Sequence, residues 1–487
     1  MIVKETDSNK FHDTYDYVIV GAGIGGLVIA NYLAREKYKV LILEQHYLVG
    51  GCCTTFSAGR QYYNAAACHL ANMGEGQPFR SLLQDLGCFE DLNFKFFDEN
   101  DAVLFKDRKE HAFFISPSIL ETQERFCSEY PRYSENIKRF FSDFFSPRFM
   151  FEIFSQSRVI SFKDLLISYE IPISIVEIFD ALFLAYYTRT TDQTHPYAAK
   201  LLLENTIFST RAMPNDNQLQ SLSNLLADKF LKNGGHLKLR TDVCSFDMSD
   251  DKNITFCIDT EGNKYHGNNF IANTSPENIY PMIRSDENVG VLSQIDKGKK
   301  IIQSRSYLIL YLSSKTQDVF NKKVNSTNCS NIIYSTKTDN KGTTSFWNDN
   351  FVYITKPYLT NQRYSLDVFV GVDNDGQILD WKDSTKKLDH TNLLIDNIKN
   401  YIDIDQIDLN QITAASPLTI RTFTKNPNGS VCGYSFLPEN KPDEYFKNKS
   451  TVLNNLFFVG HWVGPAGVDQ VALNAKKLFM LLKRDMK

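Results

Sequence analysis

The chain has 487 residues, 43% of them hydrophobic, and a formal net charge of −4. This length predicts two or three domains with enough apolar side chains for buried cores, and the charge gives no footprint for nucleic-acid binding. The nine cysteines lack the spacing of a disulfide framework or a zinc site, which favours reduced thiols in a cytoplasmic protein without a metal. The polar N-terminal residues predict no signal peptide, and the absence of an eighteen-residue apolar run predicts a soluble or peripheral protein.

A glycine-rich loop follows the first predicted strand. Residues 17–20 are apolar and mostly β-branched, and they lead into the sequence GAGIGG at 21–26, after which apolar residues repeat at helical spacing. In a dinucleotide site the first glycine permits a tight turn, the second lets the backbone approach a pyrophosphate, and the last lets the helix pack on the strand. The residues predicted to serve the phosphates are Gly21, Gly23, Ile24, Gly25 and Gly26.

A carboxylate follows the second predicted strand. Residues 39–43 complete a βαβ pattern, and Glu44 stands eighteen positions after Gly26. An acid at this point accepts hydrogen bonds from the adenosine ribose and disfavours a 2′-phosphate. A surface glutamate after an ordinary strand is the alternative, but the glycine loop favours a dinucleotide site.

The next motif narrows the cofactor. Gly50-Gly51-Cys52-Cys53 and Thr55-Phe56 extend the pattern, and residues 16–56 resemble the retinol saturase branch of the phytoene desaturase and carotenoid isomerase superfamily. The resemblance implies an α/β fold in which a Rossmann-like FAD-binding domain of the two-dinucleotide-binding-domain type carries an inserted substrate domain of mixed sheet and helices. It implies FAD, and it adds as cofactor contacts Gln45, Gly50, Gly51, Cys52, Val243, Gly460, Gly467 and Val468.

Later segments fit this architecture. We expect a helix over 219–231, strands over 235–239 and 270–273, a strand over 456–460, and a last helix over 468–482. The resemblance places the start of the last helix near the flavin ring, where its positive end would stabilise the reduced flavin. The expected FAD-binding domain comprises residues 1–115, 205–276 and 410–487, and the substrate domain comprises residues 116–204 and 277–409.

The inserted segments are apolar. Phenylalanines crowd residues 140–154, which predicts either a core helix that ends near Pro147 or a mouth that contacts a bilayer. Strands expected near 306–312, 351–354 and 366–371 would form a mixed sheet that floors an apolar substrate cavity.

No nucleophile triad, metal motif or paired carboxylate is present, so the chemistry would come from the flavin. Candidate proton-transfer groups are His69, Tyr186, Tyr187, Arg211 and His461, although a buried neutral histidine is the simpler interpretation of His69. The favoured function is an FAD-dependent oxidoreductase acting on carbon–carbon bonds of a long polyene or isoprenoid by desaturation, saturation or cis–trans isomerisation, with an unidentified electron partner and peripheral membrane contact left open. The alternatives are an amine-oxidase-like flavoenzyme and a non-catalytic prenyl or lipid escort protein.

Overall fold

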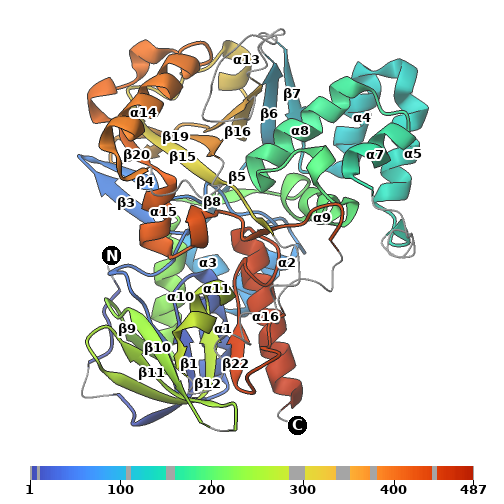
Figure 1. Cartoon of the computed structure of the whole chain (residues 1–487). Coiled ribbons are helices and arrows are strands. Elements are labelled where there is room, and N and C mark those ends of the chain that lie inside the picture. Colours follow the sequence, from blue (N-terminus) through green and yellow to red (C-terminus); the bar gives the residue numbers. More distant parts are fainter. Residues whose placement is uncertain are drawn as a thin grey trace.

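The computed structural model describes residues 3–7, 11–105, 111–149, 160–249, 251–284, 302–335, 351–372, 381–440 and 447–485. Two large sheets dominate these residues, one in the lower half of Figure 1 and one in the upper half. A group of helices stands beside the upper sheet (Figure 1). The architecture confirms the expected α/β fold, in which a Rossmann-like domain carries a second, mixed-sheet domain.

The lower sheet is the expected dinucleotide-binding sheet. Its strands run in the order β13-β10-β11-β12-β1-β2-β9, and β22 pairs with β12. Strands β9, β2, β1, β12 and β22 are mutually parallel. Helix α1 contacts both α10 and α16, and Figure 1 shows the three helices together beside the lower sheet. The bounds are β1 Thr14–Val20, α1 Ile24–Arg35, β2 Val40–Leu43, α10 Gln220–Lys232, β9 His236–Lys238, β10 Val243–Met248, β11 Ile254–Asp259, β12 Lys264–Ala272, β13 Ile283–Arg284, β22 Leu456–Phe458 and α16 Val468–Asp485.

The upper sheet separates two apolar layers. Its order is β20-β15-β19-β17-β16-β6-β7, and β18 pairs with β19. Because side chains alternate along a strand, Leu310 and Val368 face a core shared with α14, whereas Tyr311 and Phe369 face the opposite core. The bounds are β6 Glu99–Phe105, β7 Ala112–Ile115, β15 Ser306–Ser314, β16 Cys329–Ser335, β17 Phe351–Thr355, β18 Tyr358–Thr360, β19 Arg363–Val372, α14 Ser384–Ile398 and β20 Thr413–Ala415.

The second sheet draws strands from all parts of the chain. Strands β6, β7 and β20 fall within the segments expected to form the FAD-binding domain, yet they hydrogen-bond in the upper sheet. Strand β6 lies parallel to β16, with Asp101 opposite Asn331. The numerical domain boundaries stay predictions, since local patterns do not report which distant strand a segment joins.

The phenylalanine-rich segment packs as a core helix over its described part. Helix α5 ends at Phe144, before Pro147, and Phe140, Phe141 and Phe144 are buried among the neighbouring helices. Phe151 and Phe154 lie outside the described residues. The helices of this group are α4 Ile119–Glu129, α5 Ser134–Phe144, α7 Phe162–Ser168, α8 Ile173–Tyr187 and α9 Pro196–Leu202.

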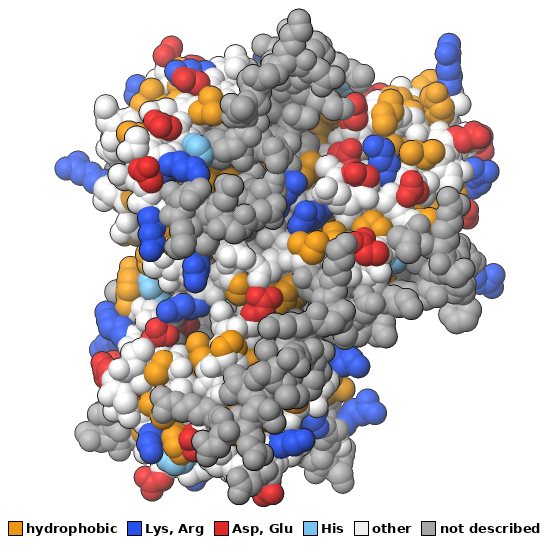
Figure 2. Space-filling view, in the orientation of Figure 1, with side chains coloured by type: hydrophobic (Ala, Val, Ile, Leu, Met, Phe, Trp, Pro, Cys, Tyr) orange, Lys and Arg blue, Asp and Glu red, His pale blue; other side chains and the backbone are white. Residues whose placement is uncertain are grey.

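The surface mixes charges of both signs. Figure 2 shows basic and acidic side chains interspersed over one face. Within the described ranges, none of the helices combines the length and apolar character needed to span a bilayer. The shorter elements are β3 Thr55–Ala58, β4 Gln61–Asn64, α2 Pro78–Asp85, α3 Phe89–Leu92, β5 Phe94–Phe96, β8 Ala212–Pro214, α11 Pro276–Ile279, β14 Ile302–Gln303, α13 Lys322–Asn325, α15 Pro417–Thr424 and β21 Tyr434–Ser435.

Candidate functional site

One continuous cavity of about 1940 Å³ runs from the glycine loop to the second sheet. At one end it is lined by residues 20–25 and by Glu44 at the end of β2. At the other end its wall is aromatic and includes Tyr307, Tyr353 and Phe369. Typical ligand pockets measure roughly 300–1,000 Å³, so this cavity has room for more than one bound molecule.

The glycine loop leaves no room for side chains. Gly21 has φ +101°, a conformation that L side chains rarely adopt, and a Cβ atom on Gly26 would lie 2.2 Å from the carbonyl oxygen of Gly21. Cβ atoms on Gly23 and Gly25 would lie 2.6 and 2.7 Å from the side chain of Asn273. Gly26 therefore lets α1 pack on β1, and the other glycines keep the backbone approachable at the start of α1. This arrangement fits a dinucleotide pyrophosphate.

Glu44 is held beside the same loop. Its Oε2 accepts a hydrogen bond from Ala22 N at 2.6 Å, and its Oε1 accepts one from His46 N at 2.8 Å. Burial raises the pKa of the Glu44 carboxyl, and the two backbone N–H donors act in the opposite direction. The carboxylate is thus fixed at the edge of the cavity, in the position that a ribose-binding acid requires.

Almost all of the predicted cofactor contacts share this cavity. Gly26 is the exception, because it serves the packing of α1 on β1. Gly51 has φ +59° and lies against the glycine loop. A Cβ atom added to it would lie 3.3 Å from Gly23 Cα. The predicted residues that line the cavity are Gly21, Gly23, Ile24, Gly25, Glu44, Gln45, Gly50, Gly51, Cys52, Val243, Gly460, Gly467 and Val468.

The start of α16 also faces the cavity, but it carries an acid. Gly467 precedes the helix with φ +118°, and Asp469 in its first turn is buried. Asp469 Oδ2 accepts hydrogen bonds from Asn72 Nδ2 at 2.6 Å and from Gln470 Nε2 at 2.7 Å. Burial raises the pKa of Asp469. The negative charge of a carboxylate at a helix N-terminus offsets the partial positive charge of that helix end.

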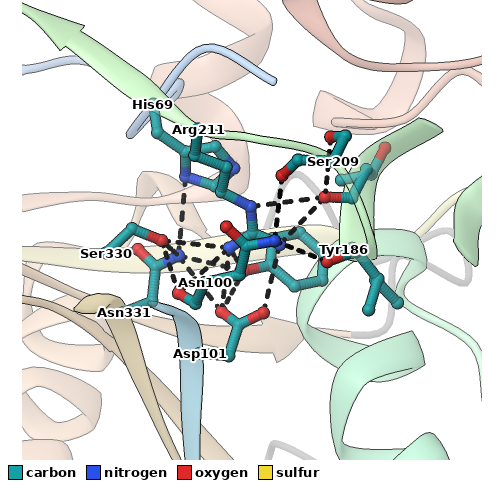
Figure 3. A network of polar contacts seen from close by, with 10 residues as sticks. His69, Asn100, Asp101, Tyr186, Ser209, Arg211, Ser330 and Asn331 are labelled. Carbon is teal, nitrogen blue, oxygen red and sulfur yellow. Dashed lines mark hydrogen bonds and ion pairs between the residues drawn. The ribbon is translucent and has the colours of Figure 1, made fainter. Parts of the chain in front are cut away.

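A buried ion pair stands behind the aromatic end of the cavity. Arg211 and Asp101 both have fully buried side chains, and Arg211 Nη1 and Nη2 lie 3.0 and 3.1 Å from Asp101 Oδ1 and Oδ2. Figure 3 shows the hydrogen bonds that surround this pair. Burial disfavours the Arg211 cation, but Asp101 and Tyr186 raise the net pKa of Arg211. The Arg211 guanidinium therefore stays charged in a dry environment, where loss of either partner of the pair costs about 3–5 kcal/mol.

Tyr186 and His69 connect this ion pair to the cavity. The Tyr186 hydroxyl donates to Asp101 and accepts from Arg211 Nη1 at 2.7 Å and from Asn331 Nδ2 at 2.9 Å. Asn331 Nδ2 also lies 3.5 Å from His69 Nδ1 (Figure 3). Both Tyr186 and His69 line the cavity. Burial, followed by the charge of Arg211, lowers the pKa of His69 well below its ordinary value, which keeps the ring neutral.

The other proton-transfer candidates are placed differently. Arg211 does not line the cavity and acts only through its neighbours. The Tyr187 hydroxyl lines the cavity region and accepts from Phe436 N at 2.6 Å. His461 also lines the cavity, but its Nε2 is sealed from solvent and has no partner among the described residues. Burial lowers the pKa of His461 to about 4, so this ring is neutral as well.

Four polar residues of the site were not predicted from the sequence. Asn273, Asp101, Asn331 and Asp469 hold the groups described above, and each is a common residue in a short segment without a motif. Of these four residues, Asn273 is the one whose sequence position best indicates a site residue. It directly follows an apolar strand, and ligands bind where the carboxyl ends of parallel strands meet. The pairing of Asp101 with Asn331 depends on the parallel contact between β6 and β16, which no local pattern encodes.

Comparisons with known proteins agree with this site. Residues 19–86 match the family model described as an NAD(P)-binding Rossmann-like domain. All-trans-retinol 13,14-reductase from Danio rerio is 35% identical over 79 residues, and prolycopene isomerase 2 from an Oncidium hybrid cultivar is 24% identical over 138 residues. The chain therefore carries a Rossmann-like dinucleotide-binding segment, and this segment is similar to those of a retinol reductase and a carotenoid isomerase.

These matches cover limited parts of the proteins concerned. The matched segment is 16% of this chain and 13% of the retinol reductase, and for the isomerase the shares are 27% and 22%. A solved putrescine oxidase variant covers 97% of this chain and 99% of its own, with a TM-score of 0.65 and 13% identity. At this identity the likeness concerns the fold alone.

Proposed function

We propose that the chain is an FAD-dependent oxidoreductase that acts on a carbon–carbon bond of a long hydrophobic polyene or isoprenoid. The observation that carries the proposal is the single cavity, which joins a dinucleotide cradle to an apolar, aromatic wall. FAD bound in the cradle would supply the acceptor or donor of a hydride. The chain itself would bind the cofactor, hold the substrate carbons and exclude water.

Residues of the cradle fit the cofactor. Gly23, Gly25 and Gly51 provide backbone at close approach for the pyrophosphate, and Glu44 provides the acceptor for the adenosine ribose. An escort protein without flavin would have no need of this combination. The preserved cradle therefore favours the enzyme over the prenyl or lipid escort.

The aromatic end of the cavity favours an uncharged substrate. Arg211 and Asp101 neutralise each other in a pair behind this wall. The nearby Asp367 carboxyl is kept protonated at neutral pH, because burial raises its pKa to about 8, so neither group offers an unpaired carboxylate to an ammonium group. A cationic amine would lose its hydration without gaining a counter-charge. This argues for the polyene or isoprenoid and against the amine-oxidase alternative.

Flavin redox state provides the test. We expect the purified protein to contain FAD. We also expect the flavin spectrum to change when the protein is mixed anaerobically with a polyene. All-trans-retinol should reoxidise the photoreduced protein if the enzyme saturates double bonds, and a partly saturated carotenoid should bleach the oxidised protein if it desaturates. Prolycopene isomerised without net flavin change would indicate the redox-neutral reaction.

The amine alternative is tested in the same experiment. Putrescine should leave the oxidised flavin unchanged. If putrescine bleaches the flavin and none of the polyenes is bound or converted, the proposed function is wrong.

A further inference from the structure

Asp469 is a buried carboxyl group in the middle of the cavity. The residue is 2% exposed and lines the cavity at the start of α16. Val471, in the same helical turn, touches the glycine loop, because a Cβ atom on Gly25 would lie 3.1 Å from Val471 Cγ1. On its other side Asp469 is hydrogen-bonded to Asn72, three residues after His69 at the aromatic end. Asp469 therefore lies between the dinucleotide cradle and the aromatic wall.

FAD bound in the cradle would extend past this carboxyl group. The glycine loop would hold the pyrophosphate, and Glu44, on one side of the loop, would accept hydrogen bonds from the adenosine ribose. The redox-active half of the molecule would then run from the loop toward the aromatic end of the same cavity. Any charge that this half gains has Asp469 as a neighbour.

The hydrogen bonds of Asp469 favour its ionised form. Asn72 Nδ2 has two hydrogen atoms and two acceptors, which are Asn205 O at 2.7 Å and Asp469 Oδ2 at 2.6 Å. Gln470 Nε2 lies 2.7 Å from the same carboxyl oxygen. Burial raises the pKa of Asp469, and these two side chains, together with the N–H groups of residues 469 and 470, act in the opposite direction. The net pKa is raised, so the group becomes charged at a higher pH than an exposed aspartate.

Within the described ranges no lysine or arginine forms an ion pair with Asp469. The first cation after it along α16 is Lys476, which pairs with Asp85. His461, on the preceding loop, is neutral because burial lowers its pKa to about 4. The charged side chains of α1, α2, α9 and the turn after α9 contact other groups; they are Arg35, Arg80, Asp85, Lys200 and Glu204. The negative charge of Asp469 is therefore offset only in part, by the positive end of α16.

We propose that Asp469 sets the reduction potential of the bound flavin, because its negative charge opposes the charge that the flavin gains on reduction. Reduction adds two electrons, and the ring keeps a negative charge unless it also takes up two protons. The inference rests on the proposed function and deepens it. A flavin of lower potential is a stronger hydride donor and a weaker acceptor, so the charge of Asp469 biases the site toward adding hydride to the substrate.

Equilibration of the flavin-loaded protein with redox dyes tests the proposal. The potentials of the wild type and of Asp469→Asn are measured from pH 6 to pH 9. Two unit charges on the order of 10 Å apart in a protein change an equilibrium constant by roughly tenfold, which is about 30 mV for a two-electron couple. We expect the potential of the variant to lie higher by about this amount at pH 9. The difference should shrink as the pH falls, because the wild-type carboxylate then takes up a proton.

Two further variants separate charge from packing. Asp396→Asn removes the same charge from an exposed position outside the cavity and should leave the potential unchanged at every pH. Asn72→Leu removes one donor and keeps the carboxyl group, so Asp469 should ionise at a higher pH and the wild-type potential should return only near pH 9. A purely structural role for Asp469 would lower the thermal stability of Asp469→Asn and Asn72→Leu without moving either potential.

The outcomes distinguish this role from the proposed function. A potential of Asp469→Asn that equals the wild-type value at pH 9, or lies below it, overturns the role of Asp469 and leaves the oxidoreductase proposal standing. Loss of flavin from both Asp469→Asn and Asp469→Ser also overturns it, because the carboxylate would then serve to hold the cofactor. A wild-type protein that contains no flavin and binds none overturns the proposed function and, with it, this inference.

Discussion

Asp367 makes the stability of this protein depend on pH in a way that one substitution can measure. The side chain is fully buried on the cavity side of β19, and burial raises its pKa to about 8. The Tyr358 hydroxyl donates to both carboxylate oxygens, at 3.1 and 2.9 Å, and only partly offsets the burial. In the unfolded chain an aspartate ionises near pH 3.9. Between about pH 4 and 8, therefore, the unfolded state loses this proton while the folded state keeps it.

The direction and the size of the pH effect on stability follow from these two pKa values. Stability contributed by the neutral carboxyl is complete below pH 4 and falls by about 1.4 kcal/mol for each pH unit up to about pH 8. Asp367→Asn keeps an acceptor for Tyr358 and cannot ionise. Its advantage over the wild type should grow by about 4 kcal/mol between pH 5 and pH 8, which is about 4 °C in Tm for a chain of this length.

Thermal unfolding at pH 5 and pH 8 is the assay. The exposed Asp396→Asn is the matched control, and its effect on Tm should be the same at both values. If Asp367→Asn shifts Tm equally at pH 5 and pH 8, the carboxyl is already ionised in the folded protein at pH 5, and the reasoning from burial is refuted.

Three further outcomes can be checked independently. Gly23→Val would place its Cβ 2.6 Å from Asn273 Nδ2, within the phosphate cradle, so the purified variant should be folded but colourless; full flavin absorbance would contradict the cradle. Phe140→Asp would bury a carboxylate among the aromatic rings of the helical core and should destabilise the protein by about 3 kcal/mol or more in urea unfolding, whereas Phe140→Leu should cost less. A soluble variant of unchanged stability would show that this side chain is not in the core. Histidine ¹⁵N spectra should show a neutral His69 at pH 6.5, where a free imidazole is half protonated, because burial lowers its pKa well below that value; a signal that titrates near pH 6.5, assigned by its loss in His69→Gln, would contradict the described surroundings.

The parts of the fold that were predictable are those with local causes. The glycine loop, Glu44 and the alternation of apolar residues in 306–312 each impose one backbone conformation or one buried face. The structure accordingly has β1, α1, β2 and β15 at the expected places. The sequence of the phenylalanine-rich helix allows two interpretations, since a stripe of apolar side chains is the same whether it packs in a core or contacts a bilayer. Burial of Phe140 and Phe144 favours the core for the described part.

The proton-handling end of the site could not be predicted in the same way. His69, Tyr186 and Arg211 were singled out separately for their chemistry, but their meeting depends on Asp101 and Asn331 standing opposite each other in parallel strands. A parallel pair is specified by tertiary packing of both faces, and no turn fixes its register. Arg211 therefore lies behind the cavity wall, where it is paired with Asp101, and not in the cavity itself.

Asp469 shows how one such residue changes an electrostatic argument. The N-terminus of α16 carries roughly half a positive charge. By itself this charge would stabilise negative charge on a molecule bound beside it in the cavity. Asp469, ionised, adds a full negative charge in the first turn of the same helix, and its burial prevents water from screening that charge. Its hydrogen bonds from Asn72 and Gln470 stabilise the ionised form, whereas burial raises its pKa. The field at this end of the cavity is therefore governed by the protonation of Asp469 more than by the helix, and a substitution at Gly467 would strain a backbone at φ +118° before it reported on that field.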